Sequence, residues 1–388
     1  MTAEPNPLGG KPPATRPTLT KTLGAISALS GRSRLDLALE MLRLRLGPGK
    51  LSPNEYVTHA LFDSALYADA DKTHFVGFRA AQMIWLRANY RVDFFGLINN
   101  KLAANALFAA HGFPVLPTLA MFRERVGRDT PLLVRSVAQL RGFLTTSRSY
   151  PLFGKPIDGH QSLGSISLER YDAASDRLIT TTGQGLSLDR FLGFVATHAT
   201  AGYLFQQRVS PHPAVREICG ERLATARLLT IVPDGRPKLA RACWKIPAGT
   251  NTADNFWRPG NLLAELDIAS GRVLRVMRRA NHGFEAITHH PDSGTPLVGT
   301  TVPNWEEISR LALEAARVVE EMPLVGWDIA PVDGGAVLVE PNESPDFKLH
   351  QIADRRGILD AEFAAFLAAR KKSAEAWLKA ARISRREQ

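Results

Sequence analysis

The sequence predicts an α+β protein with a helical N-terminal region and a strand-rich body. Three observations predict this class. The segment 35–46 has the leucine density of a helix, short apolar segments bounded by turn residues recur over residues 130–240, and a hairpin pattern surrounds residue 334. The 388 residues, of which 45% are hydrophobic, suffice for a large core and exceed one small domain. We expect two or three lobes.

The first hundred residues divide into a lead-in and a helical region. Residues 1–20 are rich in Pro, Thr and Gly and lack a hydrophobic signal core, so we expect a flexible N-terminus. Residues 21–100 are expected to be mainly helical. The helix over 35–46 should end at Gly47–Gly49, and Ser52-Pro53 is typical of a helix start. A further helix is expected over Leu102–Ala110, after Asn100-Lys101.

The body should consist of strands with short helices between them. The turn signal Pro233–Arg236 joins two of these expected strands. The expected strands cover residues 151–159, 165–171, 202–209, 223–232 and 237–246, and a helix is expected over 305–322. Residues 366–388 form a basic C-terminal tail with helical character, for which a solvated face is the simpler explanation.

The charge and the cysteine content of the chain limit the classes of protein to which it can belong. The net charge of +10 and the pI of about 9.8 favour anionic partners in general, but no RNA- or DNA-binding motif is present. No apolar run reaches membrane-spanning length. Cys219 and Cys243 form neither a disulfide framework nor a metal pattern, which indicates a reducing cytoplasm. Nothing in the sequence indicates an oligomeric state.

The segment 326–342 predicts a β-hairpin that carries acidic groups. The turn signal lies at Asp333–Gly335, so a turn centred on Gly334 would place Asp328 opposite Glu340. Like charges in cross-strand positions destabilise a sheet unless a positive group lies between them. Asn342 would add an amide oxygen on the same face, giving an all-oxygen site suited to Mg²⁺. Two unrelated surface acids are the simpler explanation.

Two further segments have the residue types of a nucleotide site. Lys155 ends an apolar strand, and the loop after it contains Gly159 and Gly164, whose backbone N–H groups could hold phosphate oxygens. A plain loop is the commoner explanation of such a pattern. The segment Gln206–Val209, which includes Gln207, closes another strand; it could bond an adenine edge, although local evidence favours a plain strand end.

A lone arginine and a polar loop complete the candidates. Arg227 lies among apolar residues of a strand and therefore needs an anionic partner, which could be a structural carboxylate or a substrate phosphate or carboxylate. Asp254-Asn255 lies in a loop rich in Gly, Asn and Thr that could line a cleft.

The order of these segments resembles the ATP-grasp superfamily, and more narrowly its sugar-transfer-associated group, which is related to α-L-glutamate ligase-like proteins. The resemblance covers roughly residues 35–365. The segments that carry it are Gly47–Tyr56, Leu152–Pro156, Thr225–Arg227, Asp254-Asn255, His290–Gly294, Gly326–Asp328 and Glu340–Asn342. It implies two α+β lobes that hold ATP, with an ATP-grasp domain over residues 101–365.

The resemblance also implies roles for individual residues. Lys101 and Lys155 would contact ATP phosphates, under a closing loop from Gly159 to Gly164. The segment Gln206–Val209 would be the adenine hinge. Three residues would hold one or two Mg²⁺ ions between the β- and γ-phosphates: Asp328, Glu340 and Asn342. Two residues would face the acceptor or the γ-phosphate: Arg227 and Asn255.

The implied activity is ATP-dependent ligation of a carboxylate through an acyl phosphate, with a small-molecule carboxylate or sugar-linked acceptor as partner. A phosphotransferase on the same fold, a nucleotide-binding protein with a degenerate site and a nucleic-acid binder remain alternatives. The sequence departs from the family pattern in the segment Phe256–Gly260, where paired glycines are expected, and in the hinge, which lacks an acidic residue. These departures affect nucleobase preference and acceptor geometry rather than metal binding.

Overall fold

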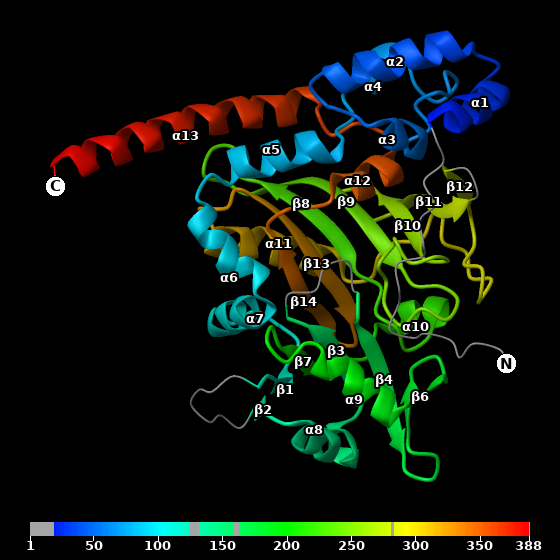
Figure 1. The fold of residues 1–388 in the computed structure, drawn as a ribbon, viewed down its shortest axis with the longest axis vertical. Coiled ribbons are helices and arrows are strands. Elements are labelled where there is room, and N and C mark those ends of the chain that lie inside the picture. Colours follow the sequence, from blue (N-terminus) through cyan, green and yellow to red (C-terminus); the bar gives the residue numbers. More distant parts are fainter. Residues whose placement is uncertain (1–18, 125–131, 158–162, 281–282, 388) are drawn as a thin grey trace.

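The computed structural model describes residues 19–124, 132–157, 163–280 and 283–387. Two seven-stranded sheets form its body, and a group of helices lies beyond the larger sheet (Figure 1). This arrangement confirms the predicted α+β class with a helical N-terminal region. The flexible N-terminus predicted for residues 1–20 falls almost wholly outside the described residues.

The N-terminal region is helical because its apolar residues repeat at helical spacing and its helices have capping side chains. Ser52 and Glu55 form a reciprocal capping box, and the Asn100 side chain accepts from two backbone N–H groups of the next helix. The helices are α1 (Leu19–Ser30), α2 (Arg34–Leu46), α3 (Pro53–Thr58), α4 (Asp69–Lys72), α5 (Phe78–Ala88), η1 (Val92–Phe94), α6 (Phe95–Asn99) and α7 (Lys101–Ala110).

The smaller sheet has the strand order β2-β1-β7-β3-β4-β5-β6. Apolar side chains of β3, β4 and β7 pack against α8 and α9 in one core cluster. Its elements are β1 (Thr118–Phe122), β2 (Leu133–Val134), α8 (Val137–Leu144), η2 (Ser147–Ser149), β3 (Leu152–Pro156), β4 (Ile166–Asp172), β5 (Arg177–Thr180), β6 (Gly185–Ser187), α9 (Leu188–Ala196) and β7 (Tyr203–Gln207).

The larger sheet has the order β12-β11-β10-β9-β8-β13-β14 and is fully antiparallel. Its central strands are buried on both faces, which explains why they read as nearly continuous apolar runs. The elements are α10 (Pro213–Cys219), β8 (Ala226–Ile231), β9 (Lys238–Ile246), β10 (Leu262–Leu266), β11 (Val273–Ala280), β12 (Gly283–Ile287), α11 (Trp305–Val318), β13 (Leu324–Val332), β14 (Gly335–Asn342), α12 (Phe347–Asp354) and α13 (Ala361–Glu387).

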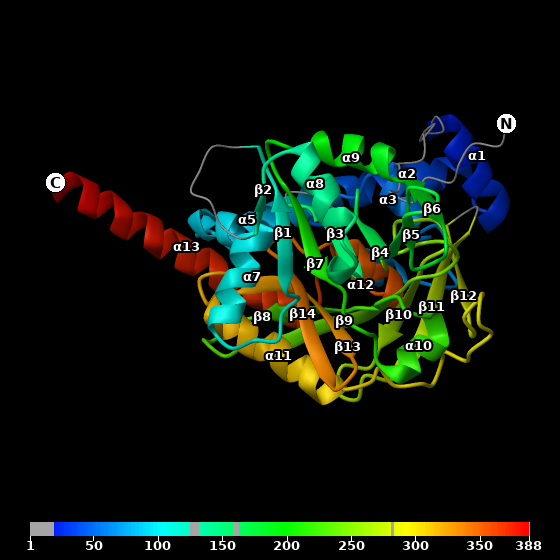
Figure 2. The same cartoon turned by 90° about the horizontal axis from the view of Figure 1, so that it is seen from below.

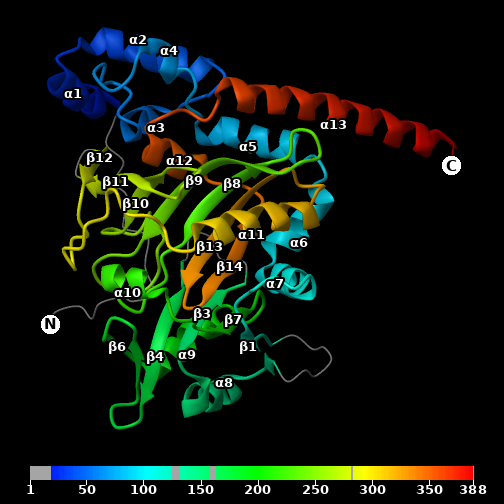
Figure 3. The same cartoon turned by 180° about the vertical axis from the view of Figure 1, so that it is seen from behind.

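Helices cover both faces of the larger sheet. Leu228 belongs to a core cluster with residues of α11, whereas its neighbour Leu229 belongs to one with residues of α5 and α13. Figure 3 shows α11 on one face and α5 with α12 on the other. Helix α13 begins at Ala361, so it runs through the boundary that the sequence predicted at residues 365 and 366. No helix among the described residues has the length and apolar character needed to cross a membrane.

Candidate functional site

A cleft lies where the two sheets meet, and we call it the inter-sheet cleft. Figure 2 shows strands of the smaller sheet passing over the larger one at this place. The smaller sheet contributes β3 and β7, and the larger one contributes the strands around β13 and β14. The lining residues are Lys101, Leu116, Phe153, Lys155, Pro156, Leu163, Ser165, Ser167, Gln207, Arg208, Val209, Glu221, Leu223, Thr225, Lys245, Thr252, Ala253, Asp254, Asp328, Val339 and Glu340.

Lys155 on β3 is the buried cation on the small-sheet side of the cleft. Only 4% of the residue is exposed, and this burial lowers the pKa of its ammonium group to about 8. The nearby Glu340 carboxylate acts in the opposite direction, while Lys101 lowers the pKa further. Lys155 is therefore a cation whose charge is poorly compensated by the protein, as expected of a group that meets an anionic ligand.

The acidic hairpin of β13 and β14 has the predicted pairing, because Asp328 lies opposite Glu340 and Val332 lies opposite Gly335. The turn has two residues, so a regular ladder would have placed Val339 opposite Asp328. An irregularity next to Asp328 inserts one residue into β14 and restores the Asp328–Glu340 pair. As a result Val339 and Glu340, although consecutive, both line the cleft.

Asp328 is neutralised by two cationic side chains of the protein itself. Arg227 donates from Nε and Nη2 to the two carboxylate oxygens at 2.6 and 2.8 Å, and Lys245 Nζ lies 3.0 Å from Oδ2. Although burial alone would raise the pKa of the Asp328 carboxyl group, these two cations hold it below the usual range. The positive group that the sequence analysis assigned to a metal is thus, at Asp328, supplied by side chains.

Arg227 therefore has the structural partner that the sequence left open. It comes from β8, directly opposite Asp328 on β13, and does not line the inter-sheet cleft. Lys245 on β9 does line it, and it was not among the site residues predicted from the sequence. Lys245 follows Trp244 in an apolar strand, so the argument applied to Arg227, that a buried charge needs a partner, could have found it.

The loop predicted to line a cleft does so through Asp254 rather than Asn255. Asp254 lines the inter-sheet cleft and accepts from the Thr225 backbone N–H at 2.8 Å and from its hydroxyl at 2.5 Å. The Asn255 side-chain oxygen instead accepts from the backbone N–H of Trp257. Asn255 thus takes part in a local turn and is not among the described residues that line the cleft.

The predicted hinge divides between the cleft and the core. Gln207 and Val209 line the cleft, as does Arg208 between them. Gln206 points into the core, where it is 1% exposed and donates to the Leu116 carbonyl at 3.2 Å. Successive residues of a strand alternate between faces, which explains why the predicted group is split.

The glycine loop is described only in part. Gly159 lies outside the described residues. Gly164 has a φ of +74° and a carbonyl that accepts from the Tyr203 hydroxyl at 2.8 Å, and a Cβ there would come within 2.8 Å of Phe194. Gly164 is therefore required by backbone conformation and close packing.

Comparison with known proteins identifies the family. Residues 81–364 match the family described as sugar-transfer associated ATP-grasp. The chain belongs to this family. No curated protein matches it.

Several solved structures are similar to this chain at low sequence identity. The D-alanine–D-alanine ligase from Bacillus anthracis is 12% identical, with 73% of this chain and 69% of that chain covered and a TM-score of 0.39. The ATP-grasp ligase PsnB is 16% identical, with 72% of this chain and 60% of that chain covered and a TM-score of 0.36. The D-alanyl-alanine synthetase A from Vibrio cholerae O1 is 15% identical, with 72% of this chain and 65% of that chain covered and a TM-score of 0.39. The chain thus spans 60–69% of the length of these three proteins.

Membership of an ATP-grasp family implies a magnesium site, and the oxygen donors predicted for it are chemically suited to this ion. Among the described residues no group of three or more His, Cys, Asp or Glu side chains could hold a metal, so the candidate set is two carboxylates and an amide. The Glu340 carboxylate has no hydrogen-bond or ion-pair partner within the described part of the chain, and the oxygens of Asp328 keep unused lone-pair positions. Carboxylate and amide oxygens suit Mg²⁺.

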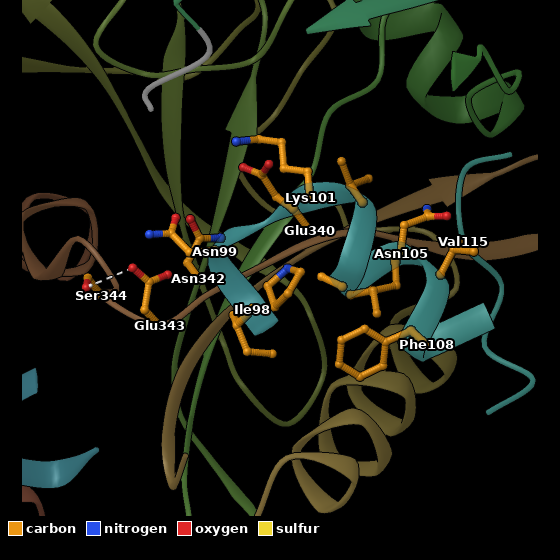
Figure 4. A pocket seen from close by; sticks show the side chains of 14 residues that line it. Ile98, Asn99, Lys101, Asn105, Phe108, Val115, Glu340, Asn342, Glu343 and Ser344 are labelled. Carbon is orange, nitrogen blue, oxygen red and sulfur yellow. Dashed lines mark hydrogen bonds between the residues drawn. The ribbon is translucent and has the colours of Figure 1, made fainter. Parts of the chain in front are cut away.

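A second cavity of this ATP-grasp protein adjoins the inter-sheet cleft, and we call it the α7–β14 pocket (Figure 4). Lys101 and Glu340 line both cavities, and Asn342 and Glu343 line the α7–β14 pocket. Lys101 begins helix α7, and its Nζ donates to the Ile157 carbonyl at 3.3 Å. The predicted metal ligands therefore lie along two adjoining cavities, because Asp328 lines one, Asn342 lines the other, and Glu340 lines both.

Proposed function

We propose that this protein is an ATP- and Mg²⁺-dependent ligase that activates a carboxylate as an acyl phosphate for coupling to an amine or another nucleophile. One observation carries the proposal: the buried cation Lys155 faces the acidic pair Asp328 and Glu340 across the inter-sheet cleft, within a chain that belongs to an ATP-grasp family. Such an arrangement suits a polyphosphate with its metal ion.

The cleft offers separate environments for the parts of ATP. Apolar side chains such as Phe153, Leu223 and Val339 suit a nucleobase, and the backbone at Val209 can bond its edge. The amino groups of Lys101, Lys155 and Lys245 suit the phosphates. Phosphate charge near Lys155 would raise the pKa of this ammonium group and keep it protonated.

Magnesium would be held by Glu340 and Asn342 together with the remaining lone pairs of Asp328. When bound, it would neutralise phosphate charge and polarise the transferred phosphoryl group. Arg227 acts as a positioning residue in this scheme, because its two hydrogen bonds orient the Asp328 carboxylate.

The reaction has two transfers. A carboxylate oxygen of the substrate attacks the γ-phosphorus and ADP leaves, which gives an acyl phosphate. The nucleophile then attacks the acyl carbon, inorganic phosphate leaves, and the nucleophile loses a proton. The protein's part is to position the reactants and to compensate charge, since phosphoryl transfer needs little covalent help from side chains. The family's description, sugar-transfer associated ATP-grasp, supports an acceptor that is linked to sugar transfer.

The proposal is tested by calorimetry of Mg²⁺·ATP binding and by assay of ADP release for the wild type and Glu340→Gln. Glu340→Gln removes a carboxylate that would hold Mg²⁺, the ion that compensates phosphate charge, so turnover should fall about 100-fold or more. Glu285→Gln is the matched control, because Glu285 lies on β12 of the same sheet and pairs with Arg278.

The two classes of activity differ in their products. A ligase yields free phosphate and a coupled product, whereas a phosphotransferase yields a phosphorylated acceptor and no free phosphate. Unchanged turnover in Glu340→Gln, with the fold intact, would contradict the metal assignment. Absence of Mg²⁺·ATP binding by the wild type would contradict the proposed function.

A further inference from the structure

Helix α2 is apolar on two opposite faces, and the described chain covers only one of them. Its inner face packs into a core cluster with residues of α1 and α3 through Leu37, Met41 and Leu44. Its outer face carries what we call the leucine stripe, whose members are 51–74% exposed: Leu35, Leu39, Leu42 and Leu46. A surface helix normally has polar residues on its outer face, so an exposed apolar face opposite the buried one is unusual.

The leucine stripe is a continuous surface rather than scattered residues. Its spacing of four, three and four residues places all the side chains within a narrow sector of the helix, along about 17 Å of its axis. Single exposed apolar residues are normal on a protein surface, whereas a contiguous apolar row bordered by charge marks an interaction site.

The charges beside the stripe are mainly positive. Arg34, Arg43 and Arg45 border it, and none of the three makes an ion pair with the described residues. The acid in this border, Asp36, accepts from the Ser33 backbone-capping hydroxyl at 2.7 Å. Long arginine side chains can lay their methylene groups on an apolar layer while their charged ends stay in the headgroup region.

Helix α13 adds a second surface of the same chemistry at the same end of the molecule. Figures 1 and 3 show α2 and α13 together at the end opposite the smaller sheet, with α13 extending past the body. In its projecting half Trp377 is 42% exposed and Leu378 is 50% exposed. Lys371, Lys372 and Lys379 are exposed beside them. Trp, Leu and Lys together are typical of a helix at a membrane interface.

We propose that the leucine stripe, supported by α13, docks this protein on an anionic lipid bilayer. The leucines would enter the boundary between headgroups and acyl chains, and the neighbouring Arg and Lys residues would meet lipid phosphates. The helix would lie in the plane of the surface. This inference rests on the exposed face of α2 and is independent of the inter-sheet cleft.

A second copy of this chain fits the stripe less well. In an antiparallel pair of α2 helices Arg45 would lie beside Arg34 of the other copy, and in a parallel pair Arg43 would lie beside the other Arg45, given 100° per residue. A stable homodimer also needs about 20 residues or more from each partner, far more than the leucines of one helix provide.

The test is co-sedimentation of the full chain with phosphatidylcholine vesicles that contain or lack phosphatidylglycerol. We expect the wild type to bind the anionic vesicles, more weakly at high salt, and to bind pure phosphatidylcholine poorly. Leu39→Gln with Leu42→Gln should weaken this binding roughly 100-fold, because both side chains lose their transfer to an apolar layer. Arg43→Gln with Arg45→Gln should weaken it roughly 30-fold.

Matched controls carry the same substitutions elsewhere. Leu132→Gln with Leu274→Gln changes two exposed leucines far from α2 in sequence, and Arg236→Gln with Arg279→Gln removes two exposed charges. Both should bind vesicles as the wild type does, and thermal unfolding should show that every variant is folded.

Two outcomes would overturn the inference. One is a wild type that fails to bind anionic vesicles, or that binds neutral and anionic vesicles equally. The other is a wild-type dimer, seen by sedimentation velocity without lipid, that the Leu39→Gln and Leu42→Gln substitutions dissociate; this would assign the stripe to self-association.

Discussion

Two buried aspartates of this protein differ in the sign of their pKa shifts. Asp328 in the inter-sheet cleft faces Arg227 at 2.6 Å and Lys245 at 3.0 Å, and its pKa lies below the usual range. Asp354 at the end of α12 has Arg241 at 3.3 Å, which also binds Asp360 at 2.6 Å. Burial raises the pKa of Asp354 to about 7.

This difference shows that nearby cationic side chains, rather than the degree of burial, determine the charge of a buried carboxyl group here. Asp328 has two cationic groups within ion-pair distance. Asp354 shares one, Arg241, while Arg275 and Arg356 have weaker effects and the nearby Glu265 carboxylate raises its pKa. The cleft is therefore built to keep an anion in place, while the α12 site is closer to a neutral acid at neutral pH.

The largest effect should come from Asp328→Asn. The substitution leaves Arg227 and Lys245 buried without their anion, so we expect a loss of roughly 3–5 kcal/mol in unfolding free energy at pH 7, measured with urea. Because the folded pKa of Asp328 is lowered, its stabilising contribution is present above the unfolded pKa near 3.9 and is lost as pH falls through the folded value.

The double variant Arg227→Met with Asp328→Leu serves as the control for packing. It removes the pair together and should recover much of the lost stability. A cost for Asp328→Asn below about 1 kcal/mol would show that the cleft pair is as weak as a surface ion pair.

The substitution Asp354→Asn should have the opposite pH dependence. The folded pKa of about 7 exceeds the unfolded value, so the proton stabilises the native state below about pH 4 and this contribution is lost as pH rises to about 7. At about 1.4 kcal/mol per pH unit, the wild type should lose up to about 4 kcal/mol relative to Asp354→Asn across that window.

Urea unfolding of both proteins at several pH values between 4 and 8 measures this difference. The comparison of the two aspartates fails if Asp328→Asn and Asp354→Asn change stability with the same pH slope.

A third carboxylate sharpens the comparison, because Glu40 has two cationic partners and a neutral donor. Lys72 lies 2.6 Å and Arg32 2.5 Å from its oxygens, and the Tyr56 hydroxyl donates at 2.9 Å. Tyr56→Phe should cost about 1.5–3 kcal/mol in thermal or urea unfolding, the range for a hydrogen bond to a charged group. A markedly larger loss would show that the cations do not compensate Glu40.

The smallest effect concerns Lys155, the cation without a close anion. In the proposed function it binds phosphate only when protonated, so its pKa of about 8 should weaken Mg²⁺·ATP binding about tenfold between pH 7 and 9. Calorimetry of Lys155→Arg should show a flatter pH profile, since arginine stays charged. Equal pH profiles for the two proteins would show that Lys155 does not bind the phosphates.

Much of the fold followed from the sequence where local signals were strong. The capping pattern at Ser52 and the turn at Pro233–Arg236 gave helix and strand positions that the structure has. The positions of the strands β10 to β12 and of the helices α9, α10 and α12 were not predicted. Their apolar residues form these elements by packing on segments that are distant in sequence, which local patterns do not show. Phe363 and Phe366 of α13 belong to a core cluster of the body, so the boundary predicted at residues 365 and 366 falls within this helix.

The candidate site could be predicted from the sequence only where the pairing of its strands could be predicted. The Asp328–Glu340 pair was predicted from a turn centred on Gly334, whereas the observed two-residue turn gives this pair only with the extra residue in β14. The two cations that face Asp328 come from β8 and β9, about 100 and 80 residues earlier, and local sequence patterns do not show such distant neighbours. Asn255 was chosen over Asp254 because the direction of a side chain in a loop cannot be derived from its neighbours.

The extra residue in β14 has a consequence for anyone who would transplant this hairpin. A regular strand delivers adjacent side chains to opposite sides, so a copied hairpin without the insertion could present either Val339 or Glu340 to a ligand, and not both. A graft onto another scaffold must therefore copy the irregularity along with the sequence, because only the extra residue turns both the apolar Val339 and the acidic Glu340 toward the ligand.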